Sequence, residues 1–271
     1  MRTTPALVIG CVLAALLLGT AAISLVWTPY PPTRIDILHK LAAPSAAHWL
    51  GTDPFGRDVA SMLMAGARNS LFVAMIAVVV GAGIGVPLGA AAAARGGWVD
   101  QLMMRTTDLA FAFPALLTAV MITALWGPGA ANAMLAIGLF NIPVFARVTR
   151  GAALSVMAQD FVTAARATGR TEWAIMRLHV LPNIAGVLIV QVTIQFALAI
   201  IADAGLSYVG LGTQPPAPSW GRMLNEAQTF IYRAPLLAVF PGAAIALSVL
   251  GLNLLGDGLR DRLDPRLSRR R

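Results

Sequence analysis

The chain has 271 residues, of which 58% are hydrophobic and only 12% are charged. A soluble domain usually carries about 25% charged residues, so this composition excludes an ordinary water-exposed surface and indicates a protein embedded in a bilayer. The net charge of +8 comes from arginine-rich segments between apolar stretches and requires no nucleic-acid partner.

Six apolar stretches are candidates for membrane-spanning helices. The hydrocarbon core requires about 20 apolar residues in a helix, because unpaired backbone groups are costly there. The first stretch is longer than a signal-peptide core and five others follow it, so we interpret it as a span. The sequence predicts an all-α integral membrane protein with about six transmembrane helices, near residues 6–26, 70–94, 109–126, 131–146, 184–206 and 236–256.

Basic residues are unevenly distributed between the two sides of this arrangement. With the N-terminus inside, 14 of the 20 lysines and arginines lie in cytoplasmic segments and 6 lie in outer segments. Because cytoplasmic loops carry an excess of positive charge, we expect both termini in the cytoplasm. Arg2 then precedes the first span, and residues 258–271 form a basic cytoplasmic tail that acts mainly as a topology signal.

The first outer segment, about 27–69, is long and begins with several prolines. Consecutive prolines exclude helix and hold the backbone extended, so we expect a shaped surface that receives a partner. A metal site formed by His39 and His48 with Asp53 or Asp58 is conceivable, but their spacing fits no recognised ligand pattern. The sequence therefore predicts no metal site.

The second span repeats glycine at fourfold spacing, at Gly81, Gly85 and Gly89. Residues with this spacing lie along one face of a helix, and small residues there let a second helix approach closely. A pore lining is the other interpretation. Tight helix packing is the one we favour.

One cytoplasmic segment stands out between the fourth and fifth spans, over residues 147–183. Gly169 is suited to end a helix in the left-handed conformation, and Thr171 is suited to cap the next one. We expect Pro182 to break the chain before the following span. These signals predict a helix–turn–helix hairpin over residues 158–182, although taken alone they leave an ordinary connecting loop equally open.

Asp203 is the one ionisable residue within the six apolar stretches, near the outer end of the fifth. An acid inside a span is costly and is a functional candidate by default. We expect it to face the bundle interior near the outer gate, as a translocation-path residue. A structural hydrogen bond to a neighbouring helix is an equal alternative. The connection that follows, about 207–235, contains further prolines and is a second outer surface.

Catalytic motifs are missing from the chain. A phosphate-binding loop requires a lysine after its glycines, and Lys40 is the only lysine in the sequence. Ser207 does not lie in a G-x-S-x-G elbow, and no histidine lies in a span, which disfavours an intramembrane hydrolase. An ion-coupled transporter is disfavoured because we find one buried acid and no clear internal repeat. We therefore expect a subunit that is not an enzyme.

The hairpin carries a recognisable pattern. Residues 163–165 read Thr-Ala-Ala, Gly169 follows, and residues 179–182 read His-Val-Leu-Pro. This spacing resembles the loop shared by permeases of binding-protein-dependent ABC importers, E-A-A-x-x-x-G followed after nine residues by I-x-L-P. Thr163 replaces the family's glutamate and His179 replaces its isoleucine.

Further segments resemble the C-type permeases of dipeptide and oligopeptide importers in particular. They are spread over most of the chain from residue 48 onward, and together they are more specific than the hairpin pattern. The matching segments are residues 48–53 (HWLGTD), 56–58 (GRD), 210–221 (GLGTQPPAPSWG), 253–260 (NLLGDGLR) and 263–266 (LDPR).

The resemblance implies the type I permease architecture of ABC importers, in a bacterial inner membrane, with a cytoplasmic coupling hairpin. It implies a second homologous permease subunit, an extracytoplasmic substrate-binding protein and two ATPase subunits that hold ATP and Mg, with no cofactor in this chain. Alternating access would import di- or oligopeptides; nickel, glutathione or another small solute is the alternative. The residues implied in ATPase coupling are Phe161, Thr163, Ala164, Ala165, Gly169, Trp173, Met176, Leu181 and Pro182.

Three regions are expected from these patterns. Residues 1–69 would form an N-terminal transmembrane helix with an extracytoplasmic segment. Residues 70–257 would form the permease core of five transmembrane helices, including the hairpin, and residues 258–271 the tail.

Overall fold

A computed structural model describes residues 5–263, so Arg2 and the part of the expected basic tail from residue 264 onward lie outside the described residues. Within this range the chain is almost entirely helical, and its only β feature is an isolated bridge between Thr52 and Asp58. The prediction of an all-α fold is confirmed. The helices are α1 (Pro5–Val26), α2 (Val59–Arg95), α3 (Gly97–Ala112), α4 (Ala115–Trp126), α5 (Ala130–Met157), α6 (Asp160–Ala167), α7 (Glu172–Ile175), α8 (Leu181–Tyr208), α9 (Trp220–Ala227) and α10 (Leu236–Leu263).

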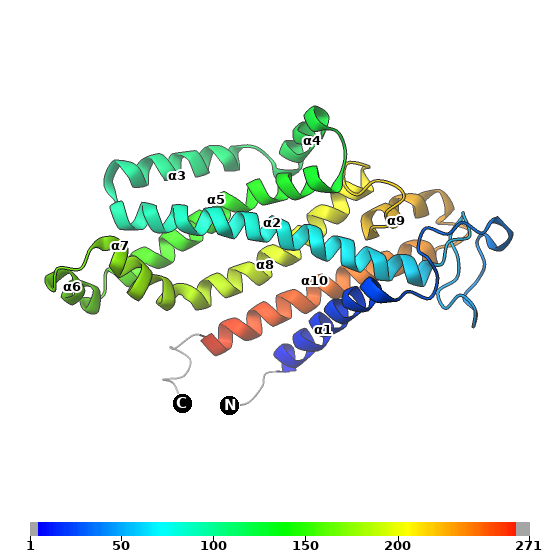
Figure 1. Ribbon diagram of the computed structural model, residues 1–271, viewed down its shortest axis with the longest axis horizontal. Coiled ribbons are helices and arrows are strands. Elements are labelled where there is room, and N and C mark those ends of the chain that lie inside the picture. The colour runs from blue at the N-terminus through cyan, green and yellow to red at the C-terminus, as the bar shows by residue number, and fades with distance from the viewer. Residues whose placement is uncertain (1–4, 264–271) are drawn as a thin grey trace.

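The long helices lie side by side as an elongated bundle (Figure 1). Within residues 5–263, five helices are long and apolar enough to cross a membrane: α1, α2, α5, α10 and the helix that runs through α7 and α8. The bent pair of α3 and α4 makes a sixth if it counts as one span. About six spans were predicted, which this arrangement confirms.

No single helix covers the span expected near 109–126, because α3 ends at Ala112 and meets α4 at an angle of 83°. Phe113 is extended (φ −95°, ψ 125°) and Pro114 follows it. A proline has no N–H to donate and disfavours helical geometry in the residue before it. The bend therefore has a local cause that apolarity alone does not reveal.

The second helix begins earlier than predicted. Asp58 caps it by accepting a hydrogen bond from the backbone N–H of Ser61 at 2.8 Å. The first long connection therefore covers residues 27–58 and not 27–69. At 1.5 Å per residue, the 37 residues of α2 span about 55 Å, well beyond a hydrocarbon core of about 30 Å.

The fourth and fifth spans are also longer than expected. Helix α5 continues to Met157, and Pro182 does not break the chain. A π-helical turn (Met176–Val180) joins α7 directly to α8, and the N–H of Leu181 donates to the carbonyl of Met176 five residues earlier. Pro182 then falls in the first turn of α8, where an intrahelical N–H is not needed. The hairpin is thus continuous with a spanning helix.

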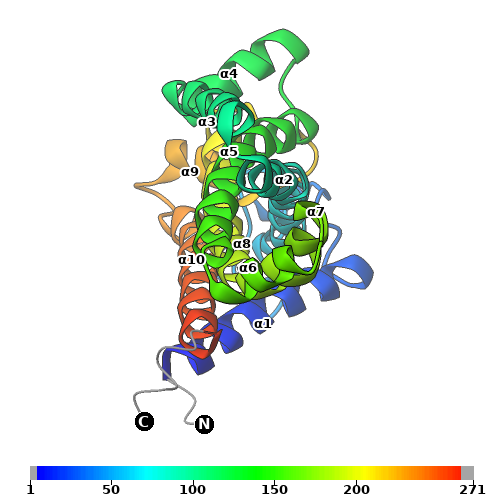
Figure 2. The same ribbon diagram turned by 90° about the vertical axis from the view of Figure 1, so that its left-hand side faces the viewer.

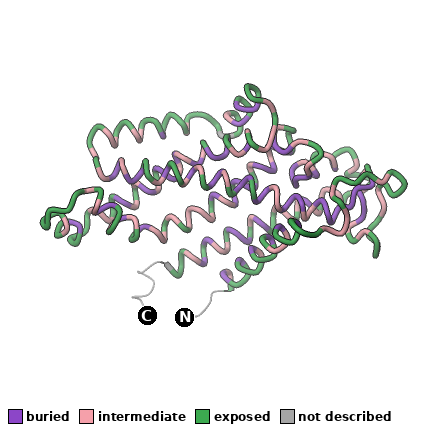
Figure 3. The backbone as a smooth tube through the Cα atoms, viewed as in Figure 1, coloured by how far each residue is buried: buried purple, intermediate pink, exposed green. Residues whose placement is uncertain are grey.

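Glycines permit the closest helix contacts. Gly81, Gly85 and Gly89 all lie where α2 packs against α5, and a Cβ on Gly85 would lie 2.7 Å from the Cβ of Phe145. A second glycine contact joins α1 to α10, where a Cβ on Gly251 would lie 2.5 Å from the Cβ of Leu13. Buried residues gather where α2, α5 and α8 meet, whereas α1 and α3 are mostly exposed (Figure 3).

The bundle has two distinct ends. The hairpin with α6 and α7 lies at one end of the long axis, and the described ends of α1 and α10 point the same way (Figure 1). Figure 2 looks along the bundle from this end, with α6 in front of the spanning helices. The 27–58 connection and α9 lie at the opposite end. The two long connections predicted to share one side of the membrane are therefore together.

Candidate functional sites

The hairpin is held to the bundle by its own small apolar core. Val162 of α6 and Ile175 of α7 are both fully buried, and Val180 of the π-helical turn is buried with them. They pack against residues from the end of α2, from α5 and from the start of α8. The hairpin therefore packs against three long helices at once. The buried residues of this core are Ala90, Ala93, Ala153, Val162, Ile175, Met176, Val180 and Ile184.

The turn of the hairpin is built by the residues that the sequence singled out. Gly169 adopts a φ of +79°, its N–H donates to the carbonyl of Arg166 at 2.9 Å, and the N–H of Arg170 donates to that of Ala165 at 3.3 Å. This is the pair of bonds that closes a helix with a left-handed residue. The hydroxyl of Thr171 accepts from the N–H of Ala174 at 3.3 Å. Both local predictions are confirmed.

Charged and aromatic contacts fasten the two short helices. Arg166 holds Glu172 with two parallel bonds, Nε to Oε1 at 2.6 Å and Nη2 to Oε2 at 3.1 Å. The guanidinium of Arg95, the last residue of α2, lies 6.0 Å from the ring centre of Trp173. Planar two-point pairing fixes orientation as well as distance. The sequence predicted neither of these two contacts, because both depend on how the hairpin packs in three dimensions.

The nine predicted coupling residues differ in how far they are exposed to solvent. Phe161 and Trp173 expose 41% and 49% of their surface, and Ala165 and Leu181 are half-buried. Met176 is only 1% exposed and belongs to the hairpin core. Met176 therefore supports the hairpin from within, and the coupling role of all nine residues stays a prediction. The exposed members are Phe161, Thr163, Ala164, Gly169, Trp173 and Pro182.

At the opposite end, a buried chain of charges joins the two long connections. Asp53 accepts the backbone N–H groups of Phe55 and Arg57, both at 2.8 Å, and also the Nε of Arg57 at 2.5 Å. Arg57 reaches Glu226 of α9 at 2.5 Å, and Glu226 also pairs with Arg222 at 2.8 Å. Residues 51–58 (GTDPFGRD) therefore stabilise their own loop and also bind it to the 209–235 connection.

Asp203 is completely buried between α8 and α2. Its Oδ2 accepts a hydrogen bond from the hydroxyl of Ser70 at 2.8 Å, and its Oδ1 has no hydrogen-bond partner among the described residues. This geometry is the structural hydrogen bond that the sequence left as an alternative. A role in the translocation path stays a prediction.

Comparison with known proteins bears on all of these sites. The family model of the binding-protein-dependent transport system inner membrane component matches residues 85–269. The chain belongs to this family. It is therefore a multi-pass transport permease subunit of an ABC importer, as the resemblance implied.

This permease is similar in sequence to permeases named for the transport of glutathione and dipeptides. The glutathione transport system permease protein GsiD of Pectobacterium atrosepticum is 46% identical over 224 residues, 83% of this chain and 74% of that one. The dipeptide transport system permease protein DppC of Alkalihalophilus pseudofirmus is 44% identical over 229 residues, covering 84% and 75%. The predicted dipeptide and oligopeptide subfamily is consistent with both.

The fold of the permease is similar to that of a solved transporter. The inward-facing MetNI methionine ABC transporter aligns with a TM-score of 0.63 at 20% identity, over 75% of this chain and 96% of that one. At this identity the likeness concerns the fold alone. The architecture predicted for an ABC importer permease is confirmed.

Proposed function

We propose that this permease forms half of the translocation pathway of an ATP-driven importer of short peptides. A second homologous permease would complete the pathway, two ATPase subunits would hold ATP and Mg, and an extracytoplasmic protein would deliver the substrate. Both termini and the hairpin face the cytoplasm in this proposal, in agreement with the excess of arginine at that end. The three expected regions (1–69, 70–257 and 258–271) are part of this proposal. In the structure α2 already begins at Val59, within the first region, and α10 continues to Leu263, within the third.

The main support for this proposal is the structure of the hairpin. Its exposed surface includes two aromatic side chains, Phe161 and Trp173, a residue type that is enriched at interfaces with protein partners. Its inner surface is locked to α2, α5 and α8. Movement of an ATPase against the hairpin would therefore tilt spanning helices as rigid bodies, which is what alternating access requires.

The peptide assignment rests on the relatives, which are named for glutathione and for dipeptides. We expect the complete transporter, co-purified with its partner subunits and placed in liposomes with its binding protein, to accumulate labelled dipeptide or glutathione when ATP is supplied. Nickel uptake serves as the comparison, and an ATPase subunit unable to hydrolyse ATP is the control. Accumulation of nickel but of neither peptide would contradict the substrate class, and uptake by this chain alone would contradict the whole proposal.

Asp203 is proposed to act near the outer gate through its hold on Ser70. Asp203→Leu is expected to fold, because an interhelical hydrogen bond in a membrane contributes about 0.6 kcal/mol on average, yet to lower uptake. The measurement is thermal unfolding and uptake of the variant beside Ser70→Ala. If Ser70→Ala lowers uptake equally, the hydrogen bond is what matters; a larger loss in Asp203→Leu supports a role for the carboxylate itself. Normal uptake by Asp203→Leu removes the residue from the mechanism.

A further inference from the structure

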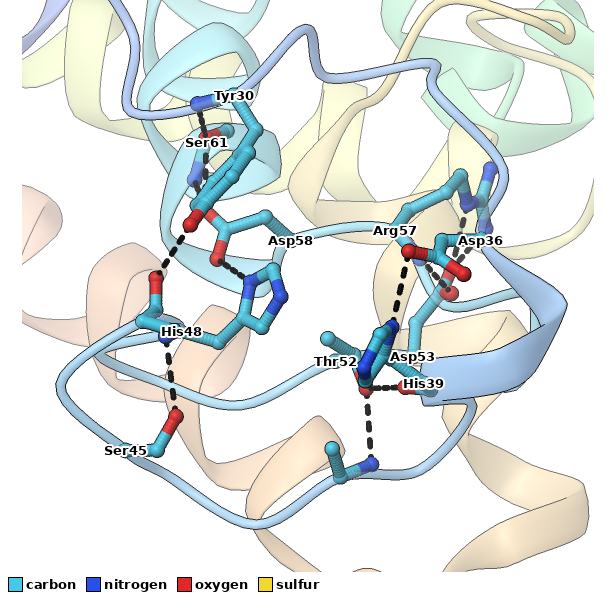
Figure 4. Close-up of polar contacts among 12 residues, drawn as sticks. Tyr30, Asp36, His39, Ser45, His48, Thr52, Asp53, Arg57, Asp58 and Ser61 are labelled. Atoms are coloured by element: carbon cyan, nitrogen blue, oxygen red, sulfur yellow. Dashed lines mark hydrogen bonds and ion pairs between the residues drawn. The ribbon is translucent and has the colours of Figure 1, made fainter.

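The 27–58 connection forms a pocket of about 370 Å³ that has no role in the transport mechanism proposed above. Two of the three histidines of the chain, His39 and His48, line it together with Asp36 and Asp58 (Figure 4). The histidines are nine positions apart in sequence, and their ring centres lie 6.4 Å apart. The fold of the loop therefore brings together side chains whose spacing fits no recognised metal-ligand pattern.

His48 is held firmly in this pocket. Its Nδ1 lies 2.9 Å from Oδ1 of Asp58, and the ring of Tyr30 packs on it with 4.7 Å between ring centres. Asp58 is itself fixed, because its other oxygen accepts both the N–H and the hydroxyl of Ser61, at 2.8 and 2.6 Å. A carboxylate can only accept, so a hydrogen of His48 resides on Nδ1, and in the neutral imidazole Nε2 then carries a lone pair.

His39 repeats the same arrangement on the other side. Its Nδ1 lies 3.0 Å from Oδ2 of Asp36, and this hydrogen bond lowers the pKa of the Asp36 carboxyl. The side chain of His39 is 61% exposed and that of Asp36 is 37% exposed, so this pair is less confined than His48 and Asp58. Among the described residues, neither His39 nor His48 uses its Nε2 in a hydrogen bond.

We infer that His39 and His48 bind one divalent transition-metal ion through their Nε2 atoms. A histidine that ligates a metal almost always gives its other ring N–H to a carboxylate or carbonyl, which fixes the ring and raises its basicity. Both histidines of this pocket have that partner. Imidazole nitrogen suits zinc, copper and nickel ions, whereas magnesium and calcium prefer oxygen.

The charges and dimensions of the pocket agree with a cation. Asp36 and Asp58 supply two negative charges against one positive charge from Arg34, which also lines the pocket. At about 2.0–2.1 Å for each metal–nitrogen bond, a tetrahedral ion requires the two Nε2 atoms to be roughly 3.3 Å apart. His48 is fixed, whereas His39 and Asp36 are both exposed, so these two side chains can move together toward His48 and keep their hydrogen bond.

The site would be open, with two protein ligands. Within residues 5–263 no three side chains of histidine, cysteine, aspartate or glutamate converge as a metal-binding group. The remaining coordination positions would hold water or an incoming ligand, as in sites that keep an open position. The metal therefore binds at the surface formed by the 27–58 connection and can leave again.

Zinc titration of the purified full chain tests this inference, with a tag that contains no histidine. We expect one Zn²⁺ per chain, measured by competition with a chromophoric chelator, and no comparable binding of Mg²⁺. His39→Gln and His48→Gln should each weaken binding at least about tenfold, and Asp36→Asn about 10–100-fold. His179→Gln is the matched control, because it changes the third histidine at the far end of the molecule and should leave the affinity unchanged.

Copper provides a second and independent readout. The electron paramagnetic resonance spectrum of bound Cu²⁺ should show coupling to imidazole nitrogens in the natural chain and lose it in the double variant His39→Gln/His48→Gln. Thermal unfolding confirms that each variant is folded; His39 is exposed, so His39→Gln remains informative even if His48→Gln is unstable. No zinc binding in the natural chain, or equal binding in the double variant, would overturn the inference.

Discussion

Gly85→Leu is expected to prevent the chain from accumulating as a folded membrane protein. A Cβ at this position already lies 2.7 Å from the Cβ of Phe145 and 3.1 Å from the backbone nitrogen of Ala146. Backbone atoms of α5 cannot move aside as a flexible side chain can, so the two helices must separate along their whole contact. Overpacking of a core usually costs about 1–3 kcal/mol and occasionally more, which is a large part of a total stability of about 5–15 kcal/mol.

Gly83→Leu is the matched control for this substitution. Gly83 lies two residues earlier on the same helix, is exposed, and has no atom within 4 Å of the position of a Cβ. The yield of monodisperse protein on gel filtration and its thermal unfolding are to be compared for both variants. Equal yield and stability of the two variants would show that glycine is not required at the crossing of α2 and α5. Normal transport by Gly85→Leu would also contradict this prediction.

Ala164→Arg is expected to separate the permease from its ATPase subunits without unfolding it. Ala164 lies exposed on α6, between Phe161 and the turn, and its side chain takes no part in the hairpin core. An arginine there adds bulk and charge in the middle of the proposed docking surface. A misfit at the centre of an interface commonly costs about 2 kcal/mol or more, which is roughly thirtyfold in affinity.

Co-purification of the ATPase subunits and ATP-dependent uptake should both fall, whereas thermal unfolding of the permease should not change. Ala46→Arg introduces the same side chain on the exposed 27–58 connection at the opposite end and should retain the ATPase subunits. If Ala164→Arg keeps a stable complex and full uptake, the exposed surface of α6 is not where the ATPase docks. Loss of the complex in both variants would indicate a general effect of charge.

Local chemistry explains which structural predictions were confirmed. The number of spans follows from apolar length and the near-absence of charge, because a charge in hydrocarbon is costly wherever the neighbouring helices lie. The turn of the hairpin follows from Gly169 and Thr171, whose effects reach only a few residues. The predictions that proved wrong, a single helix over 109–126 and a break at Pro182, concern prolines, whose effect depends on their position in the helix and on the turn before them.

The sequence by itself determined which stretches are removed from water, because apolarity is a property of the residues alone. It did not determine whether lipid or another helix covers a given face, because a lipid tail and a leucine are equally apolar. Only the tertiary structure decided that Gly81, Gly85 and Gly89 meet α5, that Met176 is buried, and that Arg57 reaches Glu226 across 169 residues of sequence. The physical reason is that such contacts depend on where whole helices lie relative to one another, and the residues of any single helix do not specify that position.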